Sequence, residues 1–175
     1  MSPPLRTQQD LDALWKGLEA GEIQIVATDH CPFNYAKEKQ DGKDDFRKCP
    51  NGAPGVEERM ILLFSEGVMK NKISINKLVE VACTNPAKVY GMYPKKGIIE
   101  PGADGDLIII DADAKQTLTH EMMHGAVDYT SYEGTPLNGK IDLVMQRGNI
   151  IAENNEFKGN RGDGQYIYRK PYFDI

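Results

Sequence analysis

The sequence predicts an α/β fold in its first half and mainly β structure in its second half. Apolar residues recur at helical spacing over residues 8–20, and a short run rich in β-branched residues follows at 23–27. After Lys95, short apolar runs alternate with glycine-containing turns, which is typical of antiparallel strands. One strand with its helices cannot form a parallel sheet alone, so the first half is expected to need more chain than is present.

The first helix is predicted over residues 8–20. Thr7 and Asp10 resemble a capping box at its start, although Asp replaces the usual Glu or Gln. Gly21 suits the left-handed conformation that commonly ends a helix. Residues 23–27 then predict a short buried strand that delivers polar residues at its C-terminal end.

A long loop is predicted over residues 30–55, where charged residues, prolines and glycines occur with little periodicity. Apolar residues at a spacing of four, beginning at Val56, predict a second helix. Ser74 is expected to cap a third helix. Pro86 falls inside that third apolar stretch, so a break or kink is expected there.

The second half predicts short strands joined by tight turns. Apolar runs at 97–99 and 107–110 flank Pro101-Gly102, which indicates two strands joined by a turn. Residues 143–152 predict a hairpin whose turn lies at Arg147-Gly148-Asn149.

Composition and charge exclude several classes of protein. The net charge of −5 and the lack of a basic stripe argue against nucleic acid or an anionic membrane as partner. No apolar run approaches the roughly 20 residues that cross a bilayer, and the first residues lack the layout of a signal peptide. Three widely spaced cysteines indicate reduced thiols in a cytoplasmic protein.

The sharpest candidate for chemistry is Asp29, which directly follows the predicted strand at 23–27. Barrel enzymes place catalytic groups at the C-terminal ends of parallel strands, where a carboxylate can bind a cation or exchange a proton with water. The alternative is purely structural: Asp29 caps a turn and His30 hydrogen-bonds a loop. The glycine-rich segment 51–55 has two comparable interpretations, as a ligand-facing loop or as the lead-in to a helix.

Other metal or nucleophile sites have little support from the sequence. His30, Cys31 and Cys49 do not form the tight ligand pairs of structural zinc sites. His120 and His124 share a face only if their segment is helical, and no third ligand lies nearby. No serine has a base in a recognisable arrangement.

A series of short motifs spans almost the whole chain in order. They are Ser2-Pro3-Pro4-Leu5-Arg6, Thr28-Asp29-His30-Cys31-Pro32-Phe33-Asn34, Pro50-Asn51-Gly52, Pro54-Gly55-Val56-Glu57-Glu58-Arg59, Thr84-Asn85-Pro86-Ala87-Lys88, Lys96-Gly97, Gly102-Ala103-Asp104-Gly105-Asp106-Leu107, Tyr132-Glu133-Gly134 and Arg169-Lys170-Pro171. Taken together, they resemble the C-terminal portion of the dihydropyrimidinase/D-hydantoinase family of cyclic amidohydrolases. Each motif is modest alone, but the ordered set is specific.

The resemblance implies the C-terminal end of a (β/α)8 metallo-dependent hydrolase barrel, followed by part of a small β-sandwich domain. Residues 1–94 are then expected to hold the last barrel strand and its flanking helices. Residues 95–158 are expected to form the sandwich portion, and the tail at 159–175 is expected to pack on a neighbouring surface. Members of the family are commonly tetramers, which implies a homo-oligomer.

The same resemblance implies the site residues and the cofactor. The family holds two metal ions, usually zinc, and Asp29 matches the aspartate ligand of the last barrel strand. The metals lower the pKa of a bridging water, and the aspartate moves a proton from that water to the departing ring nitrogen. Ser2 and Asn51 match residues whose main-chain groups grip the cyclic imide.

The other family ligands have no match in this chain, so the 175 residues alone are expected to bind no stoichiometric zinc and to be inactive. The expected substrates of the complete enzyme are hydantoins or dihydropyrimidines, because the Cys31-Pro32-Phe33 continuation and the Asn51 loop resemble those hydrolases more than allantoinases or dihydroorotases. The alternative is a non-catalytic fragment that acts as an oligomerisation or binding module.

Overall fold

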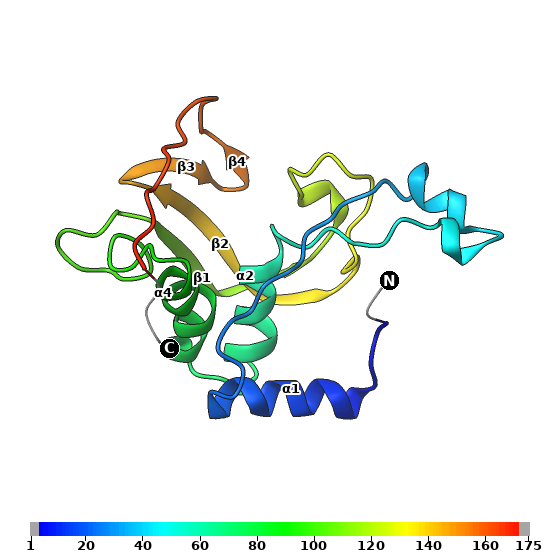
Figure 1. Cartoon of the computed structure of the whole chain (residues 1–175), viewed down its shortest axis with the longest axis horizontal. Coiled ribbons are helices and arrows are strands. Elements are labelled where there is room, and N and C mark those ends of the chain that lie inside the picture. Colours follow the sequence, from blue (N-terminus) through cyan, green and yellow to red (C-terminus); the bar gives the residue numbers. More distant parts are fainter. Residues whose placement is uncertain (1–3, 172–175) are drawn as a thin grey trace.

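The computed structural model describes residues 4–171, in which helices pack against a four-stranded antiparallel sheet of order β1-β2-β3-β4. A long loop extends away from this body on one side (Figure 1). Within residues 4–171, no helix is both long enough and apolar enough to cross a bilayer.

Helix α1 (Gln8–Ala20) has the predicted boundaries and the predicted caps. The Thr7 hydroxyl accepts the Asp10 N–H at 3.4 Å, and the Asp10 carboxylate accepts the Thr7 N–H at 3.0 Å. Gly21 ends the helix in the left-handed region with φ 80°. The short carboxylate of Asp10 therefore closes the capping box without the longer side chain of Glu or Gln.

The strand predicted at 23–27 is not formed. This segment is extended, but it joins no strand ladder within the described part of the chain. Its neighbours are helical: the Val26 N–H donates to the Val81 carbonyl at 3.1 Å, and Arg59 Nη1 reaches the Val26 carbonyl at 3.4 Å. A ladder requires a second strand alongside, and the described residues supply helices in that place.

The loop predicted over 30–55 is confirmed in outline. It contains two short 3₁₀ helices, η1 (Glu38–Gly42) and η2 (Phe46–Lys48). These short helices were not predicted from the sequence, since each lacks the periodic apolar face that marks a longer helix.

Two longer helical stretches follow the loop, and both mix α and π turns. Their parts are α2 (Arg59–Leu62), η3 (Leu63–Val68), α3 (Ile75–Val79), η4 (Glu80–Thr84) and α4 (Asn85–Val89). Ser74 caps α3 as predicted, because its hydroxyl accepts the Lys77 N–H at 3.0 Å. At Pro86 the chain stays helical. The wider π turns of η4 directly precede it and relieve the clash that proline causes in a regular helix.

The sheet begins with β1 (Leu107–Thr117), which pairs antiparallel with β2 (Pro136–Gln146). The predicted hairpin is confirmed: β2 pairs with β3 (Asn149–Glu153) across Arg147-Gly148. Both turn residues have positive φ, 49° and 81°, which matches the twist of a tight two-residue hairpin. The short strand β4 (Glu156–Phe157) completes the sheet.

The strand predicted at 97–99 is also not formed. A turn does occur at Pro101-Gly102, where the Ala103 N–H donates to the Glu100 carbonyl at 3.1 Å. The turn lies inside a loop whose two ends are joined by ion pairs. Lys95 and Lys96 contact the Asp104 carboxylate at 2.6 and 2.8 Å. These pairs fold the segment back on itself, so residues 97–99 do not lie along a neighbouring strand.

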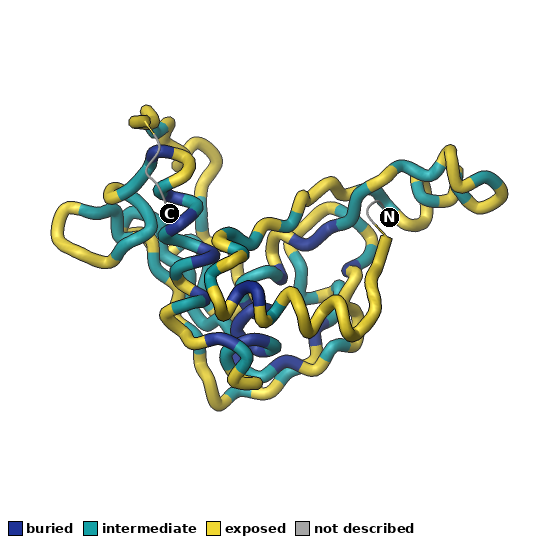
Figure 2. Tube along the Cα trace, turned by 60° about the horizontal axis from the view of Figure 1, so that its bottom comes forward, coloured by how far each residue is buried: buried dark blue, intermediate teal, exposed yellow. Residues whose placement is uncertain are grey.

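The hydrophobic core lies between the helices and the sheet. Figure 2 shows buried segments gathered near the centre, with long exposed stretches along α1 and the protruding loop. The buried cluster comprises Leu18, Ile61, Leu63, Phe64, Ile73, Leu78, Val81, Ala82, Leu118 and Leu137. It contains residues from both sides of position 95, so the helices and the strands of this chain share one core.

Candidate functional site

Asp29 lies at the end of the extended segment, where the chain turns toward the protruding loop. Its φ of 47° is in the left-handed region, which is uncommon for a residue other than glycine. The residue is exposed, and it makes no hydrogen bond or ion pair with any described residue. Unusual backbone conformations concentrate at functional sites, and here one presents an unpartnered carboxylate to its surroundings.

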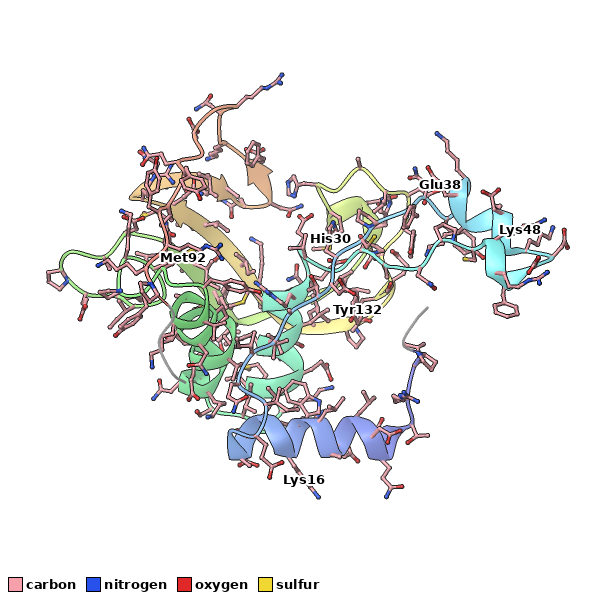
Figure 3. The ribbon with its side chains drawn as sticks, in the orientation of Figure 1. Lys16, His30, Glu38, Lys48, Met92 and Tyr132 are labelled. Atoms are coloured by element: carbon pink, nitrogen blue, oxygen red, sulfur yellow. The ribbon has the colours of Figure 1, made fainter. Side chains whose placement is uncertain are left out.

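The next residues attach this segment to the glycine-rich stretch that precedes α2. His30 Nδ1 accepts the N–H groups of Gly55 and Val56 at 3.2 and 3.3 Å, and Figure 3 shows His30 beside the start of α2. The Cys31 N–H donates to the Ala53 carbonyl at 3.2 Å. The loop-bonding role considered for His30 is therefore confirmed. The turn-capping role considered for Asp29 is wrong, because its carboxylate bonds to none of the described residues.

Gly52 allows the two segments to approach closely. Its φ is 116°, and a Cβ at this position would lie 2.4 Å from the Cys31 carbonyl oxygen. Only glycine fits such a position without displacing backbone. Asn51 lies next to this contact and is exposed. The structure thus brings the stretch containing Asn51 alongside the segment that follows Asp29.

The base of the protruding loop is tied to the connection between β1 and β2. The Asp128 carboxylate accepts the N–H groups of Tyr35 and Ala36 at 2.6 and 2.9 Å. These hydrogen bonds, from Ala36 first and then Tyr35, lower the pKa of Asp128. The rings of Tyr35 and Tyr129 also meet edge to face, with centroids 6.0 Å apart. The loop is therefore fixed where it leaves Asp29, and its tip, which includes Glu38 and Lys48, lies farthest from the body (Figure 3).

A second polar cluster surrounds His124, close to the start of α2. His124 Nδ1 lies 2.6 Å from Glu57 Oε1, and the His124 N–H donates to Glu57 Oε2 at 2.9 Å. His124 Nε2 is 3.1 Å from the Asn155 carbonyl oxygen. His120 instead points its Nε2 at the Val127 carbonyl, at 2.6 Å. The two histidines have separate partners, and each joins neighbouring segments.

Stability should therefore depend on pH through His124. The hydrogen bond with Glu57 raises the pKa of His124, burial opposes this, and the charge of Glu57 adds to it. Because the folded-state pKa lies above the unfolded value of about 6.5, the pair stabilises the fold fully below that pH. The contribution is lost as the pH rises through the folded-state pKa.

We expect His124→Gln to lower the free energy of unfolding by less than about 1 kcal/mol at pH 5.5, since the pair is partly exposed, and by less still at pH 8.5. Urea unfolding of both proteins across this range measures the difference. A difference that grows with pH would contradict the assignment.

The candidate metal ligand stands alone in the described structure. Residues 4–171 contain no group of three or more His, Cys, Asp or Glu side chains placed to hold a metal ion. Asp29 offers one free carboxylate, while the Nδ1 atom of its neighbour His30 is engaged by two backbone N–H groups. At this position the described residues thus supply the Asp29 carboxylate, a donor of the right chemistry for a hard or borderline cation. Ser2, the other residue expected to contact substrate, lies outside the described residues.

Comparisons with known proteins agree with the resemblance in the sequence. Residues 3–151 match the model of the amidohydrolase family. The chain is 45% identical over 172 residues to a D-phenylhydantoinase of Escherichia coli O1:K1, an alignment that covers 98% of this chain and 37% of that protein.

Solved structures give the same result. The D-hydantoinase of Bacillus sp. AR9 is 42% identical with a TM-score of 0.95, over 99% of this chain and 38% of that one. The dihydropyrimidinase of Brevibacillus agri NCHU1002 is 42% identical with a TM-score of 0.96 and the same coverage. An L-hydantoinase of Arthrobacter aurescens gives 35% and 0.88, over 97% of this chain and 37% of that one. The chain therefore spans little more than a third of the length of these relatives.

Proposed function

The chain belongs to the amidohydrolase family, and from this we propose that it forms part of a metal-dependent hydrolase that opens cyclic amide rings. The proposed substrates are hydantoins or dihydropyrimidines, the classes named in its relatives. The single observation that carries the proposal is Asp29. It is an exposed carboxylate without a partner among the described residues, held in left-handed backbone at the end of an extended segment.

Asp29 is the proposed proton carrier of the reaction. Bound metal ions, zinc in this proposal, supply Lewis-acid activation of water and of the ring carbonyl. The Asp29 carboxylate would contribute to holding a metal ion, and it accepts a proton from the attacking water. Asp29 then delivers this proton to the ring nitrogen as the C–N bond breaks, so one group acts first as base and then as acid.

Asn51 and Ser2 are proposed to bind the substrate through their main-chain N–H and C=O groups. The exposure of Asn51 and the close packing of Gly52 on Cys31 support this role for the loop. A ring imide presents alternating N–H and C=O groups, which backbone amides and carbonyls can match.

The extended segment at 23–27 is the proposed last strand of a barrel that residues outside this chain complete. Val26 is bonded to helical neighbours, and no described strand lies alongside. The proposed division places the barrel end at 1–94, the sandwich portion at 95–158 and the tail at 159–175. The remaining metal ligands are proposed to lie in the region of the relatives that this chain does not cover.

Assembly and location form the last part of the proposal. Tyr166 and Tyr168 are 80% and 87% exposed and meet edge to face. Such exposed aromatics favour a tail that packs on another subunit of a homo-oligomer. The cysteines Cys31, Cys49 and Cys83 are all free, which supports a cytoplasmic location. The same tail is the observation that favours the second candidate function, a non-catalytic oligomerisation module.

A chimera tests the catalytic proposal. In it, this chain replaces the aligned 172 residues of the Escherichia coli D-phenylhydantoinase. We expect the chimera to hydrolyse phenylhydantoin or dihydrouracil and the 175-residue chain alone to show no turnover. A folded chimera that hydrolyses neither ring would favour the assembly module, and turnover by the chain alone would overturn the need for completing residues.

A further inference from the structure

We propose that Lys39 is a positioning residue that orients the main chain of Asn51 for substrate, an inference that rests on the proposed function. Lys39 belongs to η1 in the protruding loop, twelve positions upstream of Asn51. Nothing in its sequence context marks it among the four lysines between 37 and 48. Its contacts in the folded chain distinguish it.

The ammonium group of Lys39 binds both sides of Asn51. Lys39 Nζ donates to the Pro50 carbonyl at 2.5 Å and to the Gly52 carbonyl at 2.7 Å. Hydrogen bonds from a charged donor are shorter and roughly twice as strong as neutral ones. One cation therefore fixes the peptide group before Asn51 and the peptide group after Gly52.

These two hydrogen bonds determine the direction of the Asn51 N–H. A trans peptide is planar, so the N–H of Asn51 points opposite to the carbonyl of Pro50 in the same peptide group. Because that carbonyl points at Lys39 Nζ, the Asn51 N–H must point away from it. This N–H donates to no described residue, so it is left available to a ligand.

Lys39 is itself held in place from the Asp29 side of the loop. Its own N–H donates to the Asn34 carbonyl at 3.1 Å, and its Nζ lies 5.4 Å from the centre of the Phe33 ring. Phe33 and Asn34 follow Asp29 by only four and five positions. Lys39 thus links the segment that follows Asp29 to the segment that contains Asn51, the residue whose main chain is proposed to bind the substrate.

Methionine at position 39 keeps a similar side-chain length but cannot donate the two hydrogen bonds to the Pro50 and Gly52 carbonyl groups. In the 175-residue chain, we expect Lys39→Met to speed hydrogen exchange of the Cys31 amide, which donates to the Ala53 carbonyl at 3.2 Å, by about 10-fold or more, since the 50–53 stretch that carries this carbonyl loses its two charged hydrogen bonds. Lys39→Arg should keep exchange close to the wild-type rate. Lys43→Met is the matched control, because that exposed side chain makes no hydrogen bond or ion pair with a described residue. Unchanged exchange in Lys39→Met would overturn the proposal.

Kinetics in the chimera separate positioning from a purely structural role. We expect Lys39→Met to raise KM by roughly 10-fold with a smaller change in kcat, and Lys39→Arg to restore most of the affinity. An active chimera whose KM is unaffected by Lys39→Met would overturn the inference while leaving the proposed function intact. An inactive wild-type chimera would count against the proposed function, and the exchange experiment would still decide the role of Lys39 in the loop.

Discussion

Replacing Asp29 by alanine in the chimera is expected to lower kcat by about 100- to 10,000-fold, the range that proton transfer by a positioned side chain contributes. The carboxylate has no partner among the described residues, so its removal leaves no buried group unpaired. The fold should therefore survive the change. The effect should appear in turnover, and the free energy of unfolding should fall by no more than about 1 kcal/mol, because alanine tolerates the left-handed backbone of this position less well than aspartate.

Two further variants control this prediction. Asp44→Ala removes another exposed carboxylate that lacks a partner among the described residues, and it should leave kcat unchanged. Ser2→Ala should cost less than Asp29→Ala, because the proposed role of Ser2 uses its main chain, which alanine retains. Equal losses in the Ser2 and Asp29 variants would contradict the assigned roles.

Leu118→Ala is expected to lower the free energy of unfolding by about 3 kcal/mol. Leu118 is 1% exposed and belongs to the cluster that joins helices and sheet. Removing a buried leucine side chain loses its transfer free energy and leaves a cavity that its neighbours fill only partly. Urea denaturation monitored by Trp15 fluorescence measures the change, since Trp15 packs against the same cluster.

Leu5→Ala is the matched control for this loss of stability. Leu5 is 84% exposed, and the same chemical change there should alter stability by less than about 0.5 kcal/mol. If both substitutions lowered the free energy of unfolding by a similar amount, the prediction that Leu118 belongs to the cooperative hydrophobic core would be contradicted.

The elements that the sequence predicted correctly are those whose signals are local. The ends of α1 depend on Thr7, Asp10 and Gly21, which act within one turn of the helix. The Arg147-Gly148 turn likewise carries its own backbone preference. The segments at 23–27 and 97–99 have apolar composition suited to strands, but a strand also needs a partner. Composition does not report which segments lie alongside.

In the candidate site, too, the features visible in the sequence are local, and those that depend on tertiary structure are not. Asp29 could be proposed from the sequence because its place after an apolar run and its family motif are both visible there. Lys39 and the Glu57–His124 pair were missed, since their partners lie many positions away and follow from tertiary structure alone. The sequence placed Pro50 and Gly52 in a motif but did not mark them as partners of Lys39, because Lys39 contacts their carbonyl groups, which every residue possesses.

Metal content measured after purification in zinc-supplemented medium tests the central claim most directly. If Asp29 is one ligand of a site that needs donors from outside this chain, the 175-residue protein should bind no stoichiometric zinc. The chimera should hold a pair of ions per chain. A stoichiometric pair of zinc ions in the 175-residue protein alone, lost on Asp29→Ala, would contradict the account.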